Sequence, residues 1–301
     1  MAMKKAFTMI ELVMVIVVLG IVASIGSEII LSLYNNYLRS RAINQLESQT
    51  ELVLEQIAKR LQYRIKDSTI ARKSDGSSTA LSNSDDTYAI IEWIGYSNES
   101  LLGTPPGWSG FIDLNHVDTN KTTHTLKTSD SNLSFTAVTM SALTNGAIDL
   151  TAGKEAALIF KKTYNSDDFG WGTSSNINHD GNATIKVIIH NTDILEISNE
   201  NASDIPDEIY EHYVLAHSAY AIVPSDFTST NFNLTLRYNY QPWNYEDFDS
   251  NPNNSALLAE HVSLFQFKQD DTVIRLKLCL HDNNETGTGD RIAICKEKVV
   301  Y

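Results

Sequence analysis

The start of the chain is poor in residues that break helices. The 301-residue sequence has six prolines, the first of them Pro105, and its first 66 residues contain only two glycines, Gly20 and Gly26. Proline and glycine are the residues that most strongly disfavour a helix interior. The opening stretch therefore carries no strong signal that would end a helix.

Positive charge is scarce. The sequence has 23 Lys and Arg against 37 Asp and Glu, which gives a formal net charge of −14. Binding to nucleic acid, or nonspecific binding to an anionic membrane surface, needs basic patches, and we expect neither. The excess of acidic residues would allow binding of divalent cations or, more simply, gives an acidic surface that favours solubility. With 42% apolar and 20% charged residues, most of the chain is expected to be globular.

Recognisable catalytic motifs are absent. The eight histidines form no HExxH pair, and the sequence has no GxSxG elbow and no Walker A loop. We therefore expect that the protein is not an enzyme, and a membrane-anchored enzyme is the least favoured of the functions considered.

A long apolar run lies near the N-terminus. Between Thr8 and Leu33 the only charged residues are Glu11 and Glu28, and residues 12–26 carry no charge. With its apolar neighbours this run reaches the roughly 20 residues that a membrane span needs. Lys4 and Lys5 precede it, so the positive-inside rule predicts a cytoplasmic N-terminus and a single-pass anchor, with the remainder of the chain on the other side of the membrane.

The apolar pattern continues past the span as a stripe on one helix face. Its members recur mostly every three, four or seven residues: Ile29, Ile30, Leu33, Tyr37, Ile43, Leu46, Val53, Leu54, Ile57, Leu61 and Ile65. We predict one nearly continuous helix over residues 7–66, on the order of 90 Å long. Residues 7–33 form its membrane half, and residues 34–66 form an amphipathic half that packs on the rest of the protein.

The segment KKAFTMIELVMVIVVLGIVASIG resembles the N-terminus of type IV prepilins and type II secretion pseudopilins. The resemblance implies a leader of residues 1–6, a prepilin peptidase cut between Ala6 and Phe7, and methylation of the new Phe7 amine. Glu11 is then the fifth residue of the mature chain, the signature acid of the family. Ala6 replaces the usual Gly, and Glu28 stands where major pilins often carry proline, which favours a minor pilin or pseudopilin.

Glu11 needs a physical explanation. A carboxylate in hydrocarbon costs at least about 2.5–3.5 kcal/mol, and a nearby positive group offsets that cost. Cleavage would create one, the Phe7 α-amine, whose unperturbed pKa is about 7.7–8.0. The resemblance implies that this amine pairs with Glu11 of a neighbouring subunit during assembly. The alternative is that Glu11 is an interfacial residue at the lipid headgroups.

Beyond Lys66 the pattern changes to short β-branched and aromatic runs. Residues 67–87 are rich in Ser, Asp and Thr and predict a loop or linker, and ALLAEHV near Ala256 is a possible short helical turn. Eight candidate strands follow the linker: YAIIEWIGY, EAALIFKKTY, TIKVIIHNTDILEI, YVLAHSAYAIV, FNLTLRYNY, HVSLFQFK, TVIRLKLCL and RIAICKEKVV. The expected fold is α+β, a long N-terminal helix packed on a β-rich, mainly antiparallel domain of residues 67–301, as in pilin-like proteins.

Cys279 and Cys295 are the only cysteines, and they flank a predicted hairpin. Outside the cytoplasm a pair placed in this way favours a disulfide, whereas in a cytosolic protein two buried thiols would be the usual interpretation. Closing such a loop stabilises by roughly 3 kcal/mol in the chain-entropy model.

The loop of this hairpin, DNNETGTGD, is rich in oxygen ligands. Asp282, Asn284 and Asp290 are candidate calcium ligands, because hard cations prefer carboxylate and carbonyl oxygens. The loop does not match the EF-hand spacing, and such loops are usually turns. Calcium binding by some pseudopilins adds to the hypothesis by resemblance, and no other cofactor is expected.

The resemblance implies a structural function. We expect a minor pilin or minor pseudopilin that is anchored in a bacterial inner membrane with its C-terminal domain in the periplasm. It would then assemble through its N-terminal helix into, or at the tip of, a type IV pilus or type II secretion pseudopilus. Its partners would be prepilin peptidase, other pilins or pseudopilins and the inner-membrane assembly platform. The alternative is a tip-located adhesin or ligand-binding protein that uses the loops of residues 76–182; its acidic balance disfavours DNA as a ligand.

Overall fold

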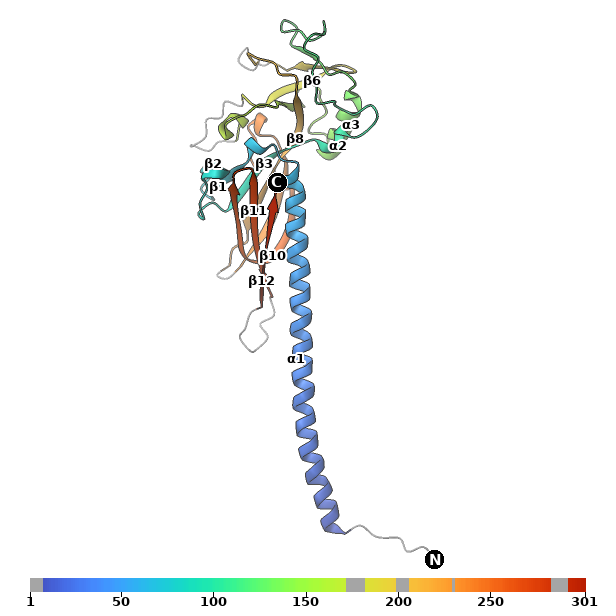
Figure 1. Cartoon of the computed structure of the whole chain (residues 1–301), viewed down its shortest axis with the longest axis vertical. Coiled ribbons are helices and arrows are strands. Elements are labelled where there is room, and N and C mark those ends of the chain that lie inside the picture. The colour runs from blue at the N-terminus through green and yellow to red at the C-terminus, as the bar shows by residue number, and fades with distance from the viewer. Residues whose placement is uncertain (1–7, 172–181, 199–205, 229–230, 283–291) are drawn as a thin grey trace, which may run out of the picture.

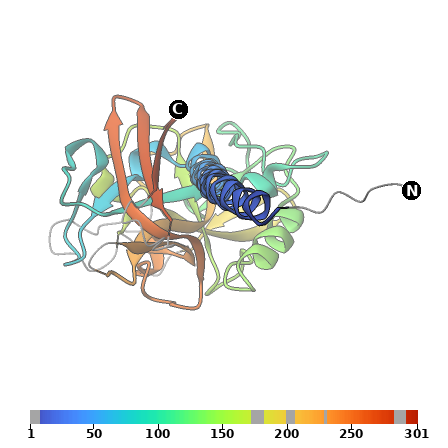
Figure 2. The ribbon, with the colours of Figure 1, turned by 90° about the horizontal axis from the view of Figure 1, so that it is seen from below.

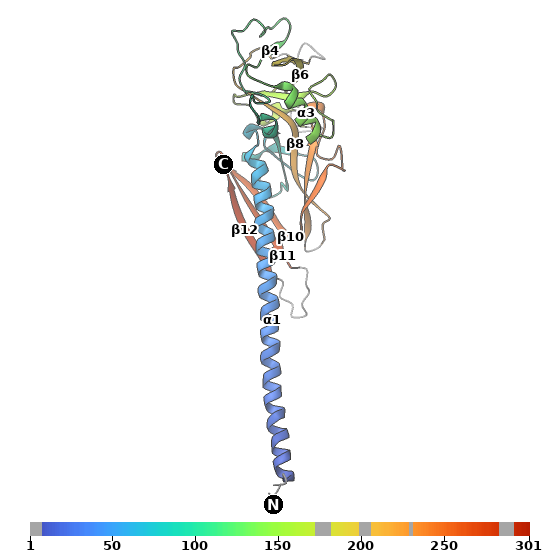
Figure 3. The same cartoon turned by 90° about the vertical axis from the view of Figure 1, so that its right-hand side faces the viewer.

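The computed structural model describes residues 8–171, 182–198, 206–228, 231–282 and 292–301. One long helix carries a β-rich domain at its C-terminal end, and its N-terminal half projects away from that domain (Figures 1 and 3). The expected α+β class is therefore confirmed.

Helix α1 runs from Met9 to Gln62, 54 residues without a break. Thr8 caps its start, and the chain leaves the helix at Tyr63. This agrees with the single helix expected from the lack of proline, although the helix ends four residues earlier than predicted. The buried residues of α1 all lie in its second half, from Leu46 to Leu61, so the amphipathic half packs on the domain as expected.

The described strands form one 12-stranded sheet in which every pairing is antiparallel. The main path is β12-β11-β10-β9-β8-β5-β6-β7-β4, with β3, β1 and β2 branching from β8. The strand bounds are β1 Ile70–Arg72, β2 Ser78–Ala80, β3 Ile90–Tyr96, β4 Thr125–Lys127, β5 Ala156–Phe160, β6 Ile185–Asn191, β7 Ile194–Ile197, β8 Tyr213–Ser225, β9 Phe232–Tyr240, β10 Ser255–Asp270, β11 Val273–His281 and β12 Ala293–Val300.

Two short helices lie at the end of the domain that is remote from the free half of α1: α2, Asn98–Leu101, and α3, Leu133–Leu143. Single 3₁₀ turns occupy Lys66–Ser68, Leu81–Asn83, Ser166–Phe169 and Pro242–Asn244. Viewed along α1, the strands β10–β12 (orange to red) lie to one side of the helix and α3 (green) to the other (Figure 2).

Two sequence expectations were wrong. Residues 67–87 are not simply a linker, because they contain β1 and β2, and Ile70 and Ala71 are completely buried. The segment ALLAEHV is part of strand β10 and not a helical turn, since Ser255, Ala256 and Leu257 pair with β9. In both cases pairing with neighbouring strands overrides the local preference.

The core that joins helix to sheet is a single cluster. It combines Leu54, Ile57 and Leu61 of α1 with buried residues from β1, β3, β8, β9, β10, β11 and β12. Two further clusters complete the core: one combines β4–β8 with α3, and the other combines residues of β1, β3, β5, β8 and β9. The second half of α1 is thus a component of the hydrophobic core.

Candidate assembly site

The first turn of α1 holds Glu11 in a capping box. The Glu11 carboxylate accepts hydrogen bonds from the Thr8 backbone N–H (3.1 Å) and from the Thr8 hydroxyl (3.0 Å), while Thr8 Oγ1 accepts from the Glu11 N–H (3.4 Å). An acid in the first turn also complements the positive end of the helix dipole. The spacing Thr8-x-x-Glu11 carries this signal in the sequence, but we did not predict it. The predicted processing residues, Ala6 and Phe7, lie outside the described residues.

Within the part of the chain that the structure describes, no other segment covers the apolar half of α1. The large apolar side chains from Met9 to Leu38 are exposed, and this helix is long and apolar enough to cross a membrane. Residues 9–33 would span about 37 Å at 1.5 Å per residue, enough for a hydrocarbon core of about 30 Å. Tyr34 and Tyr37 follow and are exposed, which suits the membrane–water interface, where aromatic residues are enriched.

Ion pairs and buried apolar side chains join the other half of α1 to the edge of the sheet. Lys296 of β12 lies 3.1 Å from a Glu51 oxygen, and Lys298 lies 2.6 Å from a Glu55 oxygen. The Lys298 ammonium lowers the pKa of Glu55, which is only partly buried. Exposed pairs of this kind add little to stability. They define which face of α1 meets β12, whereas the buried apolar residues contribute most of the free energy that stabilises the docked helix.

Arg64 locks the end of the helix to the sheet. Its guanidinium donates to the backbone oxygens of Leu61 (2.8 Å), Tyr301 (3.2 Å) and Thr272 (3.2 Å). Burial lowers the pKa of Arg64 from its ordinary value. The chain then joins β3 through hydrogen bonds from Ile65 N–H to the Ile94 carbonyl and from Tyr96 N–H to the Tyr63 carbonyl. These contacts at the C-terminal end of α1, together with the ion pairs of Glu51 and Glu55, fix the orientation of the helix on the domain.

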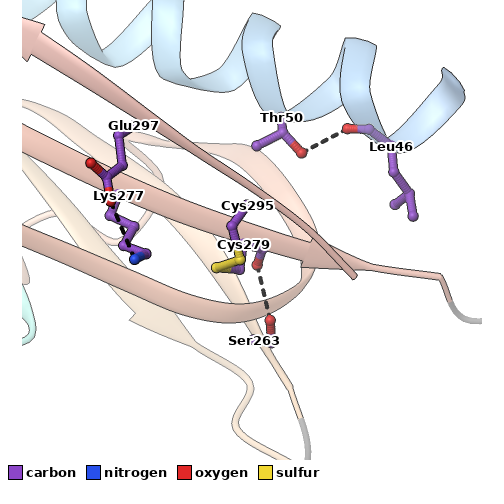
Figure 4. The surroundings of a disulfide bond; sticks show 7 residues. All are labelled: Leu46, Thr50, Ser263, Lys277, Cys279, Cys295 and Glu297. Carbon is purple, nitrogen blue, oxygen red and sulfur yellow. Dashed lines mark hydrogen bonds and ion pairs between the residues drawn. A yellow bond between two sulfur atoms is a disulfide. The ribbon is translucent and has the colours of Figure 1, made fainter. Parts of the chain in front are cut away.

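Cys279 and Cys295 form a disulfide, as predicted. They occupy directly opposite positions on β11 and β12, and neither cysteine is free. Figure 4 shows the bond between the two strands, with Leu46 and Thr50 of α1 running past them. The hydroxyl of Ser263 donates to the Cys279 carbonyl at 3.3 Å. The bond ties the edge strand β12, which contacts α1, to the inner strand β11.

The calcium hypothesis falls mostly on residues that are not described. Asp282 follows the end of β11, whereas Asn284 and Asp290 lie outside the described residues. Within the described ranges, no group of three or more His, Cys, Asp or Glu side chains is arranged to hold a metal ion. Calcium binding remains a prediction from the sequence.

A buried ionic cluster was not foreseen from the sequence. Arg72 Nε of β1 donates to one oxygen of Glu92 on β3, and the Tyr240 hydroxyl of β9 donates to the other at 3.2 Å. Glu92 is completely buried, and burial raises its pKa although Arg72 and Tyr240 act in the opposite direction. Its carboxyl is enclosed in the sheet and joins three strands. This arrangement makes it a structural element of the domain.

Comparison with protein-family models, curated proteins and solved structures finds no match to the chain. Any functional assignment therefore depends on the residues and geometry described above: an apolar half-helix with an acid in its first turn, continuous with a helix that is built into a β-rich domain.

Proposed function

We propose that the protein is a structural subunit, a minor pilin or minor pseudopilin, which assembles through α1 into, or at the tip of, a type IV pilus or type II secretion pseudopilus. One observation carries the proposal. A single uninterrupted helix is exposed and apolar in its first half and is part of the domain core in its second. Such a helix suits a subunit that is first held in a membrane by the apolar half of α1. In the filament that half would then pack against the apolar halves of α1 in other subunits.

The sequence at the start of the helix supports a mechanism for this transfer. Prepilin peptidase would remove residues 1–6 and leave a positive amine on Phe7. That amine would meet the Glu11 carboxylate of a neighbouring subunit, so that two charges enter the apolar bundle as a pair. Burying a lone carboxylate there would cost several kcal/mol, and the cost favours subunits that align the two groups.

In this arrangement the β-rich domain lies outside the membrane, where the Cys279–Cys295 disulfide can persist. Before cleavage, Lys4 and Lys5 would keep the N-terminus on the cytoplasmic side, where the peptidase would act, and the assembly platform would lie in the same membrane.

The capping box allows the charge of Glu11 to be tested separately from its role in the helix. Glu11→Gln keeps an acceptor for the Thr8 groups, because Gln also serves in capping boxes, but it removes the charge. We expect that this variant inserts in the membrane, keeps its disulfide and is lost from sheared filament fractions. Thr8→Ala, which keeps the acid and loses the capping hydroxyl, should still assemble, as should Glu47→Gln on the exposed face of the same helix.

Immunoblotting of membrane and filament fractions measures all three variants. Normal incorporation of Glu11→Gln would contradict the proposal, and so would equal losses for Glu11→Gln and Thr8→Ala, since these would point to capping alone.

A further inference from the structure

Two histidines face each other across the β10–β11 ladder. Val262 and Leu280 form the last pair of the β10–β11 ladder, and His261 and His281 are the next residue on each strand. Their ring centroids are 5.7 Å apart and the ring planes are inclined by 48°. Neither residue has a part in the proposed assembly through α1.

His281 presents a buried nitrogen with a free lone pair. Its Nδ1 lies 3.0 Å from the Asp282 backbone carbonyl oxygen, which can only accept, so Nδ1 carries the proton. Neutral imidazole then has an unprotonated Nε2. The His281 side chain is almost completely buried, and Nε2 has no hydrogen-bond partner among the described residues. A buried polar atom without a partner is rare enough in folded proteins to require an explanation.

His261 is held at an unusual backbone position. Its φ is 56°, in the left-handed region that few non-glycine residues adopt, and the register of β10 shifts on both sides of Val262. The ring is partly buried, and its Nδ1 lies 3.5 Å from the Asn231 amide nitrogen, at the limit of a hydrogen bond. In the described part of the chain the ring therefore has only a long hydrogen-bond contact, which fixes its orientation weakly.

We propose that His261 and His281 together bind one divalent transition-metal ion of the zinc, nickel or copper type, with water in the remaining positions. Imidazole nitrogen suits these ions. Two imidazoles on one zinc ion, at Zn–N of about 2.0–2.1 Å, have ring centroids roughly 5–6 Å apart, which matches the observed spacing. The bond from His281 to the Asp282 carbonyl fixes the tautomer that a metal requires, as is usual for ligating histidines.

This site differs from the calcium hypothesis in its chemistry, because calcium prefers oxygen ligands. A bound ion would join β10 to β11 at the point where the register of β10 is interrupted. The β8–β9 connection would be affected as well, since Asn231 contacts His261. The expected consequence is a domain whose stability depends on the metal.

The test uses the full-length chain without a histidine tag, in detergent micelles and free of chelators. Titration with Zn²⁺ or Ni²⁺ should show one ion per chain, and Tm should rise by roughly 5–10 °C at a hundredfold excess over Kd. Ca²⁺ at the same concentration should give no rise in Tm that His261→Asn abolishes. His261→Asn is the main variant, because Asn tolerates a left-handed backbone and lacks the imidazole.

His261→Asn should lose at least tenfold in metal affinity and lose the Tm rise, whereas His190→Asn, at an exposed position on β6, should keep both. His281→Gln should reproduce the loss if it folds. Unchanged binding by His261→Asn, or loss of binding in His190→Asn, would overturn the proposal. The Glu11 variants leave this result untouched, so the two proposals fail independently.

Discussion

Protonation of His217 should weaken the fold in mild acid. His217 lies within β8, is almost completely buried, and its Nδ1 has no hydrogen-bond partner in the described part of the chain. Burial lowers its pKa to about 4 from an ordinary value of 6.5. Between these values the unfolded chain binds a proton that the folded chain does not, so the free energy of unfolding falls as the pH is lowered from 6.5 towards 4.

The size of the effect follows from the two pKa values. Going from pH 7 to pH 5, the linkage relation gives a loss of about 2 kcal/mol from this one side chain. Guanidinium unfolding of the full chain, followed by tryptophan fluorescence at the two pH values, measures the loss. His217→Gln removes the titrating group and should reduce the difference between the two pH values by about 2 kcal/mol.

Ser218→Ala, at the adjacent and equally buried position of β8, is the matched control, since it should change stability by the same amount at both pH values. If His217→Gln keeps the wild-type pH dependence, the inference that burial suppresses protonation of His217 is refuted.

Three further predictions concern the core and its edge. Replacing both Cys279 and Cys295 by Ser should lower the free energy of unfolding by about 3 kcal/mol; an unchanged denaturation midpoint would show that pairing alone holds β12. Ile57→Ala, in the helix–sheet core, should cost about 2–5 kcal/mol, whereas Leu52→Ala, on the exposed face of the same helix, should cost less than about 0.5 kcal/mol; equal costs by chemical denaturation would contradict the docking of α1. Arg72→Met should lower the free energy of unfolding by about 3–5 kcal/mol, because it leaves Glu92 buried without its ionic partner. Adding Glu92→Leu should recover most of that loss in a double-mutant cycle. Additive losses would mean that the pair does not interact.

The elements that the sequence predicted well are those with uninterrupted local signals. Helix α1 follows from the lack of proline and the spacing of its apolar residues, and the run FNLTLRYNY coincides with β9, Phe232–Tyr240. Helix α3 was missed because LSFTAVTMSAL has no charged residue to mark an outer face and contains residues of modest helix propensity. The three-residue strands β1, β2 and β4 are too short to show an alternation.

Contacts between distant segments are the part that the sequence could not supply. The disulfide was predictable because its cysteines flank one local hairpin. Glu92 meets Arg72 and Tyr240 at sequence separations of 20 and 148 residues, and nothing in the local pattern relates these positions. The ring contact between His261 and His281 depends on the β10–β11 register and on the register shifts within β10. A shift of one residue would place the two rings on opposite faces of the sheet.

Mutations in the two halves of the continuous helix α1 should affect different processes, folding in one half and assembly in the other. Leu54, Ile57 and Leu61 are buried in a core cluster that includes residues of seven strands, so changes there act on folding of the domain. The exposed apolar residues of the other half contribute nothing to that core, so under the proposed function changes there should act on membrane insertion and on packing with partner helices. Because no proline interrupts the helix between these halves, the orientation of the domain is coupled rigidly to the packing of the apolar half. A proline placed between them, at Asn36, should therefore leave a folded domain but uncouple its orientation, and cryo-electron microscopy of filaments carrying Asn36→Pro would show blurred domains around an ordered helical centre.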